Sequence, residues 1–214
     1  MARIQGKYRV SVMRPWLRIW LVLVGIALSG ALAAEDWRLE RDRDGIQVYS
    51  RAVAGSPIRA VKGIVKIRAE LAEVVALLQN PELRPSWDEM CKESYRHDSP
   101  TTGVERIYVH HDLPWPVTDR DMLLLTEWHT DTVTGVVSMS ARAVAGGVPE
   151  YKNRVRVINA ENRWRIIPLS DSEQELIAEM HADPAGPIPA WLLNWLSIDA
   201  PFKTLQQVKA VLEK

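Results

Sequence analysis

Between residues 91 and 182 the chain is a succession of short segments in which apolar and polar residues alternate. Successive side chains of a strand point to opposite faces, so this alternation predicts strands with one buried face. Turn signals such as Pro100-Thr101-Thr102-Gly103 and Ser170-Asp171-Ser172 separate several of the segments. Connections this short join antiparallel neighbours. The strands expected here span residues 91–97, 104–111, 121–130, 135–144, 152–159, 163–168 and 174–182.

Three further strands and a helix precede this sheet. Residues 37–41 and 46–52 alternate on either side of the turn Asp42 to Gly45, and a third strand is expected over 58–67. The pattern then changes period, because apolar residues from Leu71 to Leu78 recur at the spacing of one helical face. Asn80-Pro81 ends that helix, and a short helical piece is expected over 81–87.

The C-terminal segment is also expected to be helical, beginning at Pro189, where the missing N–H costs nothing. Asp199-Ala200-Pro201 is expected to interrupt it. Its apolar stripe comprises Ile188, Trp191, Leu192 and Trp195, followed by Phe202, Leu205, Val208, Val211 and Leu212. The element order predicts an α+β fold, a curved antiparallel sheet around a long C-terminal helix. Where sheet and helix do not interdigitate fully, an apolar pocket remains between them.

The first 33 residues have the pattern of a secretory signal. Five basic residues and no acidic one occur there, and an apolar run extends from Ile19 to Ala34. Ala31-Leu32-Ala33 fits the small-residue cleavage pattern, so the mature domain is expected to begin at Ala34. The alternative is an uncleaved membrane anchor. Both alternatives predict export, which indicates the periplasm of a Gram-negative bacterium.

Composition excludes several classes of protein. Without the five leader cations, residues 34–214 hold 22 basic and 27 acidic residues, a net charge of −5. A mildly acidic domain lacks the excess of basic residues that nucleic-acid binding requires. Cys91 is the only cysteine, so an intramolecular disulfide is impossible, and we expect it to be a buried strand residue.

Two longer stretches resemble the START family, the steroidogenic-acute-regulatory-related lipid-transfer domains. Leu113-Pro114-Trp115-Pro116-Val117-Thr118-Asp119-Arg120-Asp121 resembles the segment of this family that leads into a central strand. Gly186-Pro187-Ile188-Pro189-Ala190-Trp191-Leu192-Leu193-Asn194 is similar to its entry into the final helix. A weaker likeness covers the opening hairpin, Trp37 to Tyr49. The element order agrees over nearly all of residues 35–214.

The resemblance implies a helix-grip fold whose tunnel holds one lipid or sterol-like molecule beneath the C-terminal helix. It places the acidic and basic cavity positions of the family on His110 and Thr126, so we expect a neutral cavity that prefers an uncharged ligand. The helix would move for ligand entry, with hinges at Gly186-Pro187 and at 199–201. The residues expected to contact the ligand are His110, Met122, Leu124, Thr126, Met139, Trp191, Leu192 and Trp195.

Arg120 and Asp121 are assigned a structural role, as a salt bridge or as a clamp between loop and strand. A metal site at His110-His111-Asp112 is disfavoured, because neighbouring strand side chains diverge. No cofactor is expected, and the domain is expected to act as a monomer with transient membrane contact at most. Two alternatives stay open: a helix-grip enzyme of the aromatase/cyclase or hydrolase type, and a partner-binding module whose pocket is filled by its own side chains.

Overall fold

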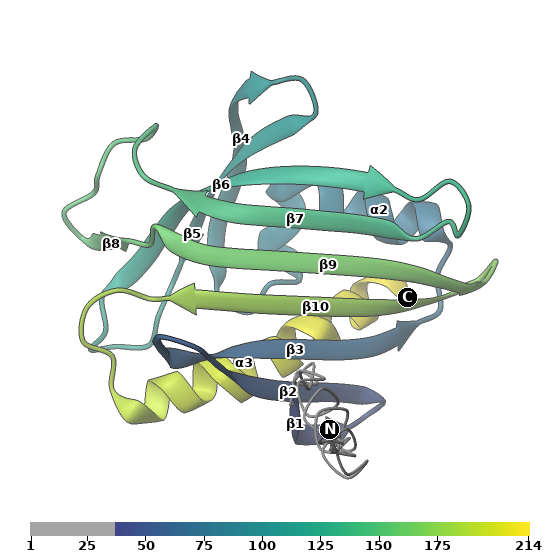
Figure 1. Cartoon of the computed structure of the whole chain (residues 1–214), viewed down its shortest axis with the longest axis horizontal. Coiled ribbons are helices and arrows are strands. Elements are labelled where there is room, and N and C mark those ends of the chain that lie inside the picture. The colour runs from purple at the N-terminus through teal and green to yellow at the C-terminus, as the bar shows by residue number, and fades with distance from the viewer. Residues whose placement is uncertain (1–36) are drawn as a thin grey trace, which may run out of the picture. The chain divides into compact units, whose positions relative to one another are not determined.

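Ten strands form one strongly curved sheet that wraps around the C-terminal helix α3 in the computed structural model (Figure 1). The structure describes residues 37–214, with the main chain only at 99–101 and 190. The predicted leader, residues 1–33, lies outside the described residues. The strands are β1 (Arg38–Arg43), β2 (Ile46–Val53), β3 (Ser56–Ile67), β4 (Cys91–Thr101), β5 (Val104–His111), β6 (Asp119–Thr130), β7 (Val137–Val144), β8 (Arg154–Arg156), β9 (Asn159–Ser170) and β10 (Glu173–Asp183).

The strand order in the sheet is β1-β2-β3-β10-β9-β7-β6-β5-β4. Every neighbouring pair on this path runs antiparallel. The first hairpin therefore lies beside the last strand. One expectation was wrong: residues 152–159 do not form an antiparallel strand. The short strand β8 pairs in parallel with β6, because the preceding loop carries the chain back to the beginning of β6 before β8 starts. Val157 N–H extends this pairing by donating to the carbonyl of Asp121.

Two helical pieces connect β3 to β4, as the change of period predicts. They are α2 (Leu71–Gln79) and the 3-10 helix η2 (Pro81–Ser86). The Glu73 carboxylate accepts the N–H of Glu70 at the beginning of α2, and Asn80 Oδ1 accepts the N–H of Glu82 at the beginning of η2. Each contact satisfies a backbone donor that the helix leaves free.

Helix α3 (Ala190–Leu212) is continuous, so the expected interruption at Asp199-Ala200-Pro201 was wrong. Proline removes one intrahelical hydrogen bond, here the one that would reach the Ser197 carbonyl. Ala200, Phe202 and Leu205 are buried around it, and this packing compensates for the lost bond. The C-terminal apolar stripe of α3 is confirmed, since Leu205 and Val208 lie in the main core cluster. Within residues 37–214, no helix has both the length and the apolarity needed to cross a bilayer.

The core consists of two clusters. The larger one joins α3 and α2 to β2, β3, β9 and β10, with Trp87 and Trp164 in edge-to-face contact at 5.6 Å. The smaller one joins β4, β5, β6 and β7 and includes Cys91, which is buried as expected. Burial raises the pKa of the Cys91 thiol to about 12, which favours the neutral thiol over the nucleophilic thiolate at neutral pH. These two clusters leave space between α3 and the inner face of the sheet.

Candidate ligand-binding site

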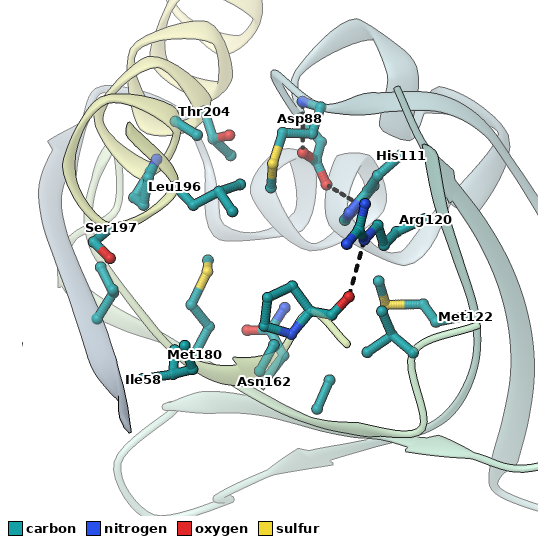
Figure 2. Close-up of a pocket in the computed structure, with 18 of the residues that line it drawn as sticks. Ile58, Asp88, His111, Arg120, Met122, Asn162, Met180, Leu196, Ser197 and Thr204 are labelled. Carbon is teal, nitrogen blue, oxygen red and sulfur yellow. Dashed lines mark hydrogen bonds and ion pairs between the residues drawn. The ribbon is translucent and has the colours of Figure 1, made fainter. Parts of the chain in front are cut away.

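An internal cavity of about 160 Å³ lies between α3 and the concave face of the sheet. Figure 2 shows side chains such as Ile58, Met180, Met122 and Leu196 pointing toward one common space. Helix α3 contributes one continuous face to the wall: Leu193, Leu196, Ser197, Ala200, Pro201 and Thr204. The sheet contributes side chains from β3, β5, β6, β9 and β10. The wall is predominantly apolar, as a pocket for an apolar molecule requires.

Strand β6 brings Met122 and Leu124 to the cavity wall, as the alternation predicts. Thr126, on the same face, and Met139 on β7 line a second cavity of about 30 Å³. Arg84, Leu124, Asn162 and Trp164 line both cavities, so the smaller one adjoins the larger. The structure therefore brings together four of the eight residues predicted to contact the ligand.

His110 does not line either cavity, so its expected placement was wrong. Its ring lies on the opposite face of β5, with Nε2 2.8 Å from Asp119 Oδ2. His111, the next residue along the strand, lines the cavity instead. Its Nε2 is 3.7 Å from Asp88 Oδ2, too far for a hydrogen bond, and has no such partner among the described residues.

The three predicted residues at the N-terminal end of α3 do not line the cavity either. Trp191 is 53% exposed, whereas Leu192 is buried and Trp195 is half-buried, both outside the cavity wall. The face that lines the cavity is rotated by about one residue, roughly 100° on a helix. Leu193 and Leu196 occupy the positions that the sequence pattern had assigned to their neighbours.

Arg84 and Asp88 form a buried ion pair on the cavity wall, which the sequence pattern did not reveal. Arg84 Nε lies 2.7 Å from Asp88 Oδ2, and both side chains are largely shielded from solvent. They flank Trp87, where η2 ends and the chain turns toward β4. In the sequence, only their spacing of four residues indicates that the two side chains could pair. Pairs with this spacing are also common on exposed helix surfaces, so the spacing does not predict burial.

Arg120, which was expected to form a salt bridge or a clamp between loop and strand, has main-chain carbonyls as its hydrogen-bond partners. Arg120 is 4% exposed, and its guanidinium donates to the carbonyls of Thr118, Pro184 and Ala185. Figure 2 shows the bond to Pro184 as a dashed line. Arg120 thus clamps the β10–α3 loop to the beginning of β6. Burial lowers the pKa of Arg120, and the nearby Asp119 charge opposes that effect.

Asp121, for which a structural role was also expected, lies on the opposite face of β6. Its carboxylate, 1% exposed, accepts two hydrogen bonds from Arg156 at 2.7 and 2.9 Å and one from the Tyr108 hydroxyl at 2.9 Å. This bidentate pair fixes β8 against β6. Among residues 37–214, no three His, Cys, Asp or Glu side chains gather as a metal ion would require.

The model of the START domain family matches residues 26–214. The chain belongs to the START family. A STAR-related lipid transfer protein from Xanthomonas axonopodis is 31% identical, and its crystal structure superposes with a TM-score of 0.75 over 83% of this chain and 99% of that one. The helix-grip fold expected from the resemblance is therefore confirmed.

Two further relatives extend the comparison. An uncharacterized protein of Pseudomonas aeruginosa is 31% identical over 204 residues, 94% of this chain and all of its own length. The human phosphatidylcholine transfer protein is 24% identical over 169 residues, 77% of this chain and 78% of its own.

The cavity of this START domain is not free of charged groups, contrary to the expectation. Arg84, Asp88 and Arg120 contribute shielded charges to its wall, and Arg59 and Glu161, which are exposed to solvent, also border it. The Arg84 and Asp88 charges compensate each other, and the Arg120 guanidinium is occupied by three carbonyls. The expected cavity positions lie on β5 and β6, whereas Arg84 lies in η2 and Asp88 in the segment that connects η2 to β4.

Replacing Asp88 with asparagine should lower stability at neutral pH by about 2 kcal/mol, because a charged hydrogen-bonded partner of Arg84 is lost. Burial favours the neutral carboxyl, but the Arg84 charge and the neighbouring His111 outweigh it and hold the pKa of Asp88 well below 3.8. A depressed pKa contributes stability above the unfolded-state value, which is lost as pH falls through the folded-state value.

The difference in unfolding free energy between wild type and Asp88→Asn should therefore be full at pH 7 and should shrink below about pH 4. Urea unfolding at a series of pH values measures it. Asp171→Asn, at an exposed turn position, is the control and should leave stability at pH 7 unchanged. A difference that grew toward acid pH would contradict the assigned ion pair.

Proposed function

We propose that this START domain binds a lipid or another largely apolar molecule in the cavity between α3 and the sheet, and transfers it as a monomer. The cavity itself carries the proposal, because a concave, mostly apolar space beneath α3 can shield a water-insoluble molecule from solvent. A relative of 31% identity with the same fold is named as a lipid transfer protein, which supports the proposal. We propose a binding role without catalysis.

Filling the cavity tests this proposal. Leu196 lies on the cavity face of α3, so Leu196→Trp would place an indole in the space that the ligand requires. Organic extraction of purified wild-type protein should yield a lipid by mass spectrometry, and the amount per mole of protein should fall toward zero in Leu196→Trp.

Asn194→Trp is the matched control, because Asn194 is exposed on the same helix. It should retain the wild-type lipid content, and circular dichroism should show both variants folded. An equal lipid content in Leu196→Trp would place the bound molecule outside the cavity. An empty wild-type protein that bound no added lipid would overturn the proposal.

We propose further that the domain touches the membrane transiently through two exposed tryptophans. Trp115 is 90% exposed in the β5–β6 loop, and Trp191 is 53% exposed at the beginning of α3. Each is close in sequence to a residue of the cavity wall, Leu113 and Leu193 respectively. Tryptophan is favoured at membrane interfaces, where its apolar ring and its N–H are both accommodated.

Trp115→Ala should slow lipid transfer between vesicles several-fold without lowering the amount of lipid bound, since the side chain does not line the cavity. A fluorescent-lipid transfer assay measures the rate. Val133→Ala is the control, because Val133 is also exposed but lies in the β6–β7 turn. A transfer rate unchanged by Trp115→Ala would contradict membrane contact through this loop.

Export is proposed on the leader pattern alone. Intact-mass measurement of protein from the exported fraction should show a chain that starts at or near Ala34, and a full-length chain in the membrane fraction would establish the anchor alternative.

A further inference from the structure

The small cavity of about 30 Å³ holds polar atoms that the protein does not satisfy. The indole Nε1 of Trp87, the indole Nε1 of Trp128 and the hydroxyl Oγ1 of Thr126 are all buried, and none has a hydrogen-bond partner among residues 37–214. All three side chains line this one cavity. A buried donor without a partner is costly, so three around one space indicate a missing counterpart.

The contrast with Trp164 is informative, since it lines the same cavity but its indole N–H donates to Asn162 Oδ1 at 2.8 Å. The indole N–H groups of Trp87 and Trp128 have no such acceptor within hydrogen-bond distance in the described part of the chain. An indole N–H can only donate, so whatever completes the site must carry an acceptor.

We propose that this cavity is a subsite for a neutral acceptor oxygen, a carbonyl or hydroxyl oxygen, at the innermost end of the bound ligand. The inference rests on the proposed lipid-binding function and adds to it. The two cavities adjoin, because they share lining residues such as Leu124 and Asn162, and the proposal requires the ligand to extend from the larger cavity past these residues into the subsite.

The charge state of the oxygen follows from the neighbouring groups. The only cation that lines the subsite among the described residues is Arg84, and its charge is paired with Asp88 at 2.7 Å. A carboxylate or phosphate would therefore be buried without a free counter-charge, which is strongly unfavourable. The ligand class is thus an apolar molecule with an uncharged oxygen at its deep end, in contrast to a lipid that enters with a plain methyl terminus.

Two isosteric probes test the subsite. 2-Undecanone and 2-methyl-1-undecene have the same shape, and only the ketone offers an acceptor. Competition against N-phenyl-1-naphthylamine should give a ketone affinity about tenfold above that of the alkene, which corresponds to one or two net hydrogen bonds. The carbonyl stretching band of the bound ketone should shift to lower frequency, as a hydrogen-bonded carbonyl requires.

Thr126→Val replaces the hydroxyl by a methyl group of similar size and should reduce the ketone preference about fivefold while the alkene affinity stays unchanged. The same variant should raise the melting temperature of the ligand-free protein, because an unsatisfied buried hydroxyl is removed. Ser94→Ala is the control, since Ser94 Oγ is also buried and unpaired but lines neither cavity.

The outcomes separate this inference from the function on which it rests. Equal affinity for the two probes would overturn the subsite and leave lipid binding intact. A lower melting temperature of ligand-free Thr126→Val would show that water satisfies the hydroxyl and would also overturn the subsite. If neither probe bound to the wild-type protein, both proposals would fail.

Discussion

Arg120→Ala should destabilise this domain by about 4 kcal/mol and lower its melting temperature by about 10 °C, because three charge-assisted hydrogen bonds in a buried site are lost together. The guanidinium donates to the carbonyls of Pro184 at 2.9 Å, Ala185 at 2.7 Å and Thr118. Truncation removes all three bonds at once and leaves a void where the buried guanidinium lay, beside carbonyls that are only partly shielded from solvent.

The loop that Arg120 holds is also strained. Ala185 has a φ of 56°, in the left-handed region that a residue with a Cβ seldom adopts. Its N–H donates to Asp183 Oδ1 and its carbonyl accepts from Arg120, so both hydrogen bonds fix this conformation. Without Arg120 the loop should relax and the beginning of α3 should lose its fixed position against the cavity.

Thermal unfolding and differential scanning calorimetry measure the effect. Arg120→Lys should recover part of the stability, since an ammonium donates to some of the carbonyls but lacks the planar fork. Arg163→Ala is the matched control, because Arg163 is exposed and its pairing with Glu161 at 3.2 Å contributes little. A change of less than about a degree in Arg120→Ala would show that the clamp is dispensable.

Alternation and turn signals predict most of the sheet, because each strand position repeats with period two. The choice of face in β5 could not be predicted in the same way. Tyr108 and Val109, which point to opposite sides, are both fully buried. The network of Tyr108, Asp121 and Arg156 covers the outer side, so both faces are apolar or shielded. A pattern that looks buried on both sides gives no indication that His111 rather than His110 faces the cavity.

Helix α3 was ambiguous for a related reason. Its first turns contain two apolar stripes, one through Trp191 and Trp195 and one through Leu193 and Leu196. Only the position of α3 relative to the sheet decides which stripe is covered, and periodicity within the helix does not contain that information. The Arg84–Asp88 pair was missed because nothing local distinguishes a buried pair from an exposed one.

Leu205→Ala should destabilise the domain by about 3 kcal/mol, because a fully buried side chain is truncated and leaves a cavity. Leu205 is 1% exposed and packs over Gly63 in the middle of β3. A Cβ built on Gly63 would lie 2.5 Å from Leu205 Cδ1, so the helix can approach the sheet only where the strand has no side chain. Leu83→Ala, at a 44% exposed position, is the control and should cost less than about 1 kcal/mol.

This close approach makes a double-mutant cycle decisive. Gly63→Ala alone should cost about 2 kcal/mol, since the added methyl group must displace a tightly packed side chain. In the Leu205→Ala background the same methyl group enters the space that the leucine vacated, so the double variant should be about as stable as Leu205→Ala, a coupling of about 2 kcal/mol. Additive losses in urea unfolding would mean that α3 does not rest on β3 at this point. A coupling of this size would show that the C-terminal half of α3 is packed tightly against the sheet. Any movement of the helix for ligand entry would then be confined to its N-terminal half, beside the loop that Arg120 clamps.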